Sequence, residues 1–89
     1  MTCYIVAFQA GLETTRQKVR ELLKTYGTYC PIDDTCWAIV TDKKATEIRD
    51  HLKTAVGSGD RIFVVRSGTE GAWWNAISTK HTDWLKQHL

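Results

Sequence analysis

The sequence predicts an α+β fold in which two helices lie against one face of a four-stranded antiparallel sheet. Two observations predict it. Strand-like and helix-like segments follow one another in the order strand, helix, strand, strand, helix, strand. Pro31, which cannot donate a backbone hydrogen bond, falls in the second strand, where such a fold places a sheet edge. This order is typical of the ferredoxin-like sandwich, and 89 residues suit a single domain over residues 1–89.

Four segments rich in β-branched and aromatic residues are expected to be the strands: residues 3–9, 28–32, 35–41 and 61–66. Between the first two strands, apolar residues recur at helical spacing from Val19 to Tyr26 and predict a helix. Thr14 and Gln17 have capping-box spacing at its start, and Gly27 is expected to end it. Right-handed crossovers would place the first and third strands in the centre of the sheet.

The second helix and the C-terminal segment follow from the same patterns. Four apolar residues at helical spacing predict the second helix: Ala45, Ile48, Leu52 and Val56. After the fourth strand, Ser67 and Glu70 again have capping-box spacing, which predicts a short helix through Trp73 and Trp74. A final helix is expected over residues 82–88. The domain is therefore expected to end in short C-terminal helices.

Both faces of the predicted sheet are apolar. In residues 3–8 the side chains on one face are Cys, Ile and Ala, and those on the other are Tyr, Val and Phe. A sheet with one face in water would instead alternate apolar and polar residues. Two helices can cover only one face, and the C-terminal helices are short. A second copy stacked sheet on sheet is therefore expected to cover the other face, which predicts a symmetric homodimer.

Composition excludes several classes of function. Twelve Lys and Arg residues against ten Asp and Glu give a net charge of +2, too small to indicate nucleic-acid binding by itself. No apolar run approaches the ~18 residues of a membrane-spanning helix, and the first residues lack the basic region of a signal peptide. Cys3, Cys30 and Cys36 fall in strands, and no Cys or His pair has zinc-site spacing. We expect a reduced, cytoplasmic protein with no cofactor and no bound metal.

Four segments of the chain resemble the SinR-like proteins, which are small relatives of the CRISPR-associated endoribonuclease family: YIVAFQ, LLKTYGTY, CWAIVTDKKATEIRDHLK and FVVRSGTEGAWWN. Members of that family form the dimeric core of the spacer-integration complex. The resemblance covers nearly the whole chain. It implies a ferredoxin-like homodimer, in agreement with the two apolar faces.

The resemblance does not extend to the metal ligand of the nucleases. In those members a Tyr-Asp pair ends the first strand, and the Asp of each subunit holds a divalent metal at the dimer interface; the matching pair here is Phe8-Gln9. Gln is neutral and binds Mg²⁺ poorly, so charge neutralisation and activation of water are lost. We therefore expect no catalytic residue. A relocated metal site at Asp33, Asp34 and Asp60 is one alternative, and turn-stabilising hydrogen bonds are the other interpretation of these carboxylates.

The first candidate ligand site is the end of the sheet where the first helix begins. Gln9, Arg16 and Arg61 are expected to gather there. The N-terminal N–H groups of a helix favour an anion, which a phosphate held by Arg16 or Arg61 would supply. The alternative is that Thr14 only caps the helix and the arginines are solvated.

The second candidate ligand site follows the fourth strand. Arg66, Ser67, Trp73 and Trp74 combine a cation, a hydroxyl and aromatic rings, which are the groups that hold a phosphate and stack a base. Trp73 matches a tryptophan of the resembled family and is expected to pack internally. Trp74 would serve either a dimer contact or ligand stacking.

Together these features predict a non-catalytic homodimer that binds a nucleotide or a nucleic-acid fragment, as a defence or counter-defence protein that sequesters a signalling nucleotide would. Two alternatives stay open: a metal-dependent endoribonuclease with a rearranged site, and a dimeric protein-interaction scaffold. The missing carboxylate at position 9 disfavours the nuclease. The absence of a long basic tract disfavours a scaffold that grips a nucleic-acid duplex.

Overall fold

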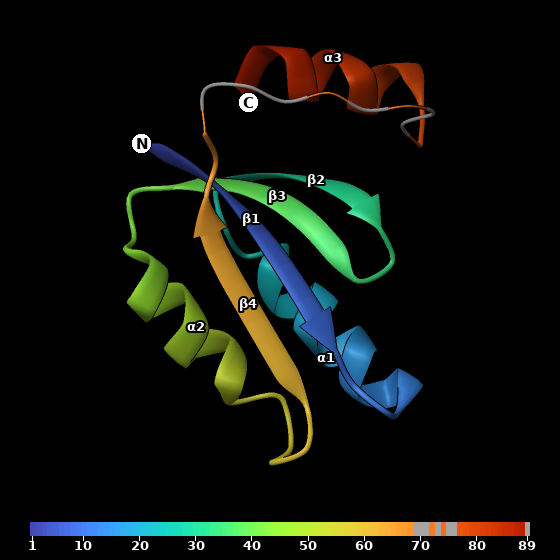
Figure 1. Ribbon diagram of the computed structural model, residues 1–89, viewed down its shortest axis with the longest axis vertical. Helices are drawn as coiled ribbons and strands as arrows, with labels where there is room; N and C mark the ends of the chain where they lie inside the picture. Colours follow the sequence, from blue (N-terminus) through green and yellow to red (C-terminus); the bar gives the residue numbers. More distant parts are fainter. Residues whose placement is uncertain (69–71, 73, 75–76, 89) are drawn as a thin grey trace.

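The computed structural model describes residues 1–68, 72, 74 and 77–88 of the chain. These residues form one four-stranded antiparallel sheet with helices on both of its sides (Figure 1). The elements in chain order are β1 (Thr2–Gln9), α1 (Glu13–Leu23), β2 (Thr28–Asp33), β3 (Cys36–Thr41), α2 (Ala45–Lys53), β4 (Arg61–Arg66) and α3 (Thr79–His88). This is the α+β, ferredoxin-like arrangement that the sequence predicts, and the predicted strands are confirmed to within a residue at each end.

The strand order of the sheet is β2-β3-β1-β4. The first and third strands are therefore central, as predicted, and Pro31 lies on the edge strand β2. The register of β2 against β3 shifts between Pro31 and Asp33. β4, the opposite edge strand, pairs with β1 without interruption from Arg61 to Arg66.

The main hydrophobic core lies between the sheet and the helices α1 and α2. The apolar stripe of each helix and the even-numbered side chains of β1 meet there, together with side chains of β3. The buried residues are Tyr4, Val6, Phe8, Val19, Leu23, Trp37, Ile39, Ile48 and Leu52. Burying one such side chain stabilises the fold by about 1.5–3 kcal/mol, so this layer is the main source of stability.

α1 begins earlier than the capping box predicts. Leu12 is the N-cap residue, with an extended backbone and no side-chain capping bond, and Thr14 lies within the first turn. The capping-box prediction at Thr14 and Gln17 is therefore wrong. Glu13 stands in the first turn, where a carboxylate interacts favourably with the helix dipole, so the N-terminus is stabilised by charge instead. The helix also ends at Leu23, before Gly27.

α2 contains three of the four residues that predict it. Ile48 and Leu52 are buried, and Ala45 packs against them. The Glu47 carboxylate accepts a 3.0 Å hydrogen bond from the Lys44 backbone N–H and satisfies the start of the helix. Val56 follows the helix but still packs against the same core.

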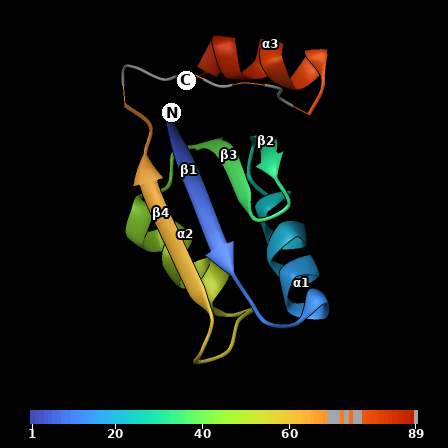
Figure 2. The same ribbon diagram turned by 45° about the vertical axis from the view of Figure 1, so that its right-hand side comes forward.

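α3 lies over one end of the sheet (Figure 2) and packs against the face opposite α1 and α2. Its Leu85 is buried against Cys30 and Ala38, and Trp84 packs beside it. The Trp84 indole N–H donates a 2.8 Å hydrogen bond to the Thr28 hydroxyl on β2. The expectation that the C-terminal helices are too short to cover this face is thus wrong in part, because α3 covers the portion nearest β2.

The C-terminal segment differs from the prediction in two further respects. Ala72 and Trp74 lie outside any helix, which contradicts the short helix predicted through Trp73 and Trp74. Residues 69–71 and Trp73, which were part of that prediction, lie outside the described residues. The final helix begins at Thr79 rather than at residue 82.

Replacing Leu23 by Ala should lower the free energy of unfolding by about 2–5 kcal/mol, because the side chain is fully buried and the cavity cannot collapse completely. Urea denaturation followed by circular dichroism measures this change. Leu12→Ala is the matched control, since Leu12 is 67% exposed and the change should stay within about 0.5 kcal/mol. Equal effects of the two substitutions would contradict the assigned core.

Candidate functional site

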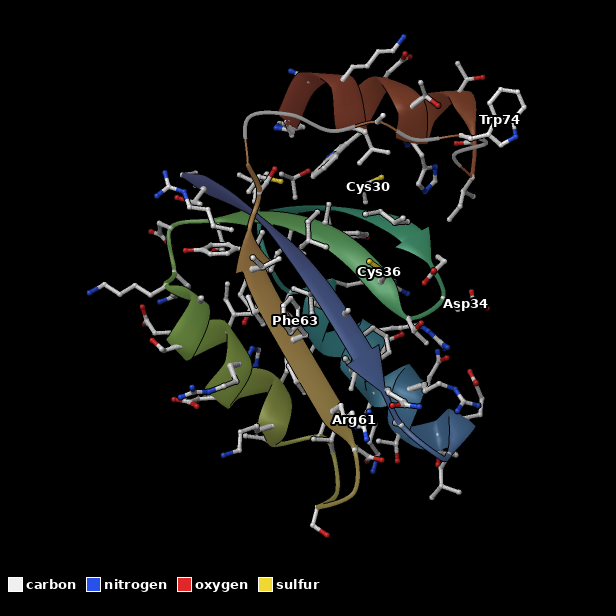
Figure 3. The ribbon with its side chains drawn as sticks, in the orientation of Figure 1. Cys30, Asp34, Cys36, Arg61, Phe63 and Trp74 are labelled. Carbon is white, nitrogen blue, oxygen red and sulfur yellow. The ribbon has the colours of Figure 1, made fainter. Side chains whose placement is uncertain are left out.

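α3 divides the second face of the sheet into a covered part and an uncovered half. We define the uncovered half by the side chains of Ala7, Cys36, Phe63 and Val65, which the strand register places on one face. Phe63 is 63% exposed and Val65 is 43% exposed. Figure 3 shows Phe63 along β4 and Cys36 on β3, with α3 lying beyond them. The result is an apolar patch on the surface of the sheet.

The uncovered half ends in two polar side chains. Gln9 at the end of β1 and Arg61 at the start of β4 are directly paired in the register, so their side chains stand next to each other on this face. Both residues are exposed. Within the described part of the chain, Arg61 forms no ion pair. Its guanidinium, with five N–H donors, and the Gln9 amide can together bind an anion.

Arg16, the third residue of the first predicted cluster, uses its side chain to form hydrogen bonds within the fold. Its guanidinium donates a 2.8 Å hydrogen bond to the Glu13 carboxylate and a 2.6 Å bond to the Ala10 carbonyl. Arg20 donates to the same carboxylate at 2.8 Å and to the Asp34 carbonyl at 3.0 Å. These bonds tie α1 to the end of β1 and to the β2–β3 turn.

The two arginines also stabilise the ionised form of Glu13. The hydrogen bond from Arg20, followed by that from Arg16, lowers the pKa of the Glu13 carboxyl below its usual value. The negative charge of the carboxylate is thus balanced by the two guanidinium groups. A hollow of about 620 Å³ beside this network is lined by residues that include Gln9, Arg16 and Asp34. Among the first predicted cluster, Arg61 is thus better disposed than Arg16 to bind a phosphate.

Two of the three acidic residues of the alternative metal site, Asp33 and Asp60, stabilise turns through their carboxylates. The Asp33 carboxylate accepts a 2.8 Å hydrogen bond from the Thr35 backbone N–H. The Asp60 carboxylate accepts bonds from Gly57 at 2.8 Å and from Gly11 at 3.4 Å. Across residues 1–68, 72, 74 and 77–88, no group of three or more His, Cys, Asp and Glu side chains is placed to hold a metal ion. The geometry favours the turn-stabilising interpretation of these carboxylates.

The second predicted cluster does not form one pocket. Arg66 is paired with Tyr4, which places it on the side of the sheet that α1 and α2 cover. Ser67 follows β4 and donates its backbone N–H to the Cys3 carbonyl at 2.9 Å. Trp74 is 86% exposed and projects outward near the start of α3, away from the end of β4 (Figure 3). Trp73 lies outside the described residues.

The cysteines lie on the same face as the uncovered half. Cys30 is buried beneath Leu85, and Cys3 and Cys36 are half-buried. Burial raises the pKa of all three thiols above the usual value, so they are protonated at neutral pH. The sequence identifies this face as apolar, but it does not show that Trp84 and Leu85 would cover part of it. In the sequence, the one indication of this contact is that Trp84 and Leu85 are adjacent apolar residues in a short predicted helix.

Comparisons with known proteins support the fold alone. The chain matches no protein-family model, and it matches no curated protein sequence. A crystal structure described as that of a hypothetical protein from Thermus thermophilus is similar to the chain, with a TM-score of 0.71 and 21% sequence identity. The similarity covers 84% of this chain and 92% of that one. The resemblance to the SinR-like proteins thus stays a prediction.

No helix among the described residues has both the length and the apolar character that crossing a membrane requires.

Replacing Leu85 by Ala should expose Cys30 by weakening the packing of α3 on the sheet. We expect iodoacetamide to label Cys30 severalfold faster than in the parent protein, as measured by peptide mass spectrometry. Cys36 serves as the internal control, because it lies outside the area that α3 covers. An unchanged rate at Cys30 would contradict the docking of α3, and an equal rise at Cys36 would indicate global unfolding.

Proposed function

We propose that this protein is a non-catalytic homodimer that binds the phosphate of a nucleotide or short nucleic acid at the seam between its two copies. The observation that carries the proposal is the uncovered half of the sheet. It is an apolar patch that ends in the paired side chains of Gln9 and Arg61.

A second copy is the occupant that best fits this patch. Phe63 and Val65 stand on the open face of an antiparallel sheet, and two such faces stack about 10 Å apart with their side chains interdigitated. Because α3 covers the side nearest β2, the centre of the patch lies between β1 and β4. A two-fold axis along the strands at this position would place β4 of each copy over β1 of the other and leave each α3 at the flank.

The same axis would bring the Gln9 and Arg61 side chains of both copies to one end of the seam. Two guanidinium groups would then stand close together, and their repulsion would be relieved by an anion bound between them. Arginine and amide N–H groups match the oxygens of a phosphate. Charge complementarity thus supports the class of ligand, whereas the pairing of the two copies rests on the apolar patch.

Phe63→Asp should convert the dimer to a monomer, because a charge buried without a partner costs several kcal/mol. Sedimentation velocity at micromolar concentration measures the change, and circular dichroism checks the fold. Leu12→Asp is the matched control, since Leu12 is exposed to a similar degree but lies outside the uncovered half. A parent protein that sediments as a monomer would contradict the proposed dimer.

Arg61→Gln should weaken the binding of nucleoside monophosphates and short oligoribonucleotides by roughly tenfold, because a charge-assisted hydrogen bond is lost. Chemical-shift titration followed by NMR measures this affinity, and parent binding should weaken as salt is raised. Arg49→Gln, which removes an exposed arginine from α2, is the matched control. Equal binding by the parent and Arg61→Gln would place the ligand elsewhere.

A further inference from the structure

The two edges of the sheet differ in how they resist pairing with another strand. β2 carries Pro31 and a register irregularity next to it, both of which obstruct an incoming strand. β4 has neither feature, and its register with β1 is regular along its whole length. Its sequence, Arg-Ile-Phe-Val-Val-Arg, is rich in residues that favour strands and contains no carboxylate. Among the described elements, no strand lies beyond β4.

The register shows which backbone groups of β4 point outward. Ser67 donates its N–H to the carbonyl of Cys3, so residues 3 and 67 form a hydrogen-bonded pair. Hydrogen-bonded and non-hydrogen-bonded pairs alternate along an antiparallel ladder. Ile62, Val64 and Arg66 therefore belong to the non-hydrogen-bonded pairs with β1. Their N–H and C=O groups point away from β1 and into the free edge.

The charges at the two ends of β4 indicate what kind of strand would bind there. Arg61 and Arg66 are exposed at its ends, and the described residues hold no ion-pair partner for either. A second copy pairing β4 with β4 would bring four arginines together without a carboxylate. An extended peptide with an acidic residue at each end would instead neutralise them.

We propose that the β4 edge binds an extended acidic–apolar peptide segment of a partner protein by strand addition. Its backbone would bond to Ile62, Val64 and Arg66. Acidic side chains would lie opposite Arg61 and Arg66, and apolar side chains opposite Phe63 and Val65. This surface lies in the plane of the sheet, whereas the proposed dimer uses side chains perpendicular to it, so the inference goes beyond the proposed function.

The probe is the capped peptide Glu-Val-Thr-Val-Thr-Glu, which has this pattern for an antiparallel strand, with Lys-Val-Thr-Val-Thr-Lys as its control. We expect the acidic peptide to slow amide hydrogen exchange at Ile62, Val64 and Arg66, as measured by NMR. Val64→Pro should keep the fold, because the lost N–H points outward, and should weaken binding roughly tenfold or more. Val65→Pro should instead disrupt the sheet, because that N–H bonds to β1.

Arg66→Gln tests the site independently of any backbone change and should weaken binding of the acidic peptide severalfold with the fold retained. Equal binding of the acidic and basic peptides would overturn the proposal. So would slow exchange at the three amides in the absence of peptide, which would show that a second copy already covers the edge. Phe63→Asp followed by sedimentation tests the dimer separately, so failure of one proposal is distinguishable from failure of the other.

Discussion

The structure depends on one constraint: a four-stranded sheet has two apolar faces, and α1 and α2 can cover only one of them. The covered face supplies the main core, in which Val6, Ile39 and Leu52 are fully buried. The second face must bury its side chains differently, because exposed apolar surface of this size favours association. α3 covers part of it through Leu85, and the tether from Trp84 to Thr28 fixes the position of that helix. What α3 leaves uncovered is the apolar patch that carries the proposed dimer.

The polar residues around the uncovered half form two groups, one that stabilises the fold and one that does not. Glu13, Arg16 and Arg20 hold the start of α1 against the end of β1 and the β2–β3 turn, so they preserve the shape of this end of the sheet. Gln9 and Arg61 take no part in that network and stay directed at the open face. Among the described residues neither side chain forms an ion pair, and donors that are already in place would lose little entropy on binding the proposed anion.

The strands and their order follow from the sequence because β-branched residues and their period of two are local signals. Pro31 likewise marks its strand as an edge without any knowledge of the fold. The start of α1 could not be predicted in this way, because Glu13 is stabilised by Arg20, about two helical turns along α1, rather than by a local cap. The position of α3 depends on the contact of Leu85 with Cys30, which joins residues distant in the chain.

The pairing of Gln9 with Arg61 does follow from the topology, whereas Arg66 and Trp74 are close in sequence but lie apart in space.

We propose that a second copy covers what α3 leaves open. Isotope-filtered NMR on a mixture of labelled and unlabelled protein tests it most directly, because it detects only contacts between copies. The proposed dimer should give intermolecular contacts from the Phe63 ring to the methyl groups of Ala7 and Val65, and none to Val19 or Leu23 in the main core. The absence of intermolecular contacts at concentrations where the protein sediments as one species, or contacts confined to the outer faces of α1 and α2, would contradict it.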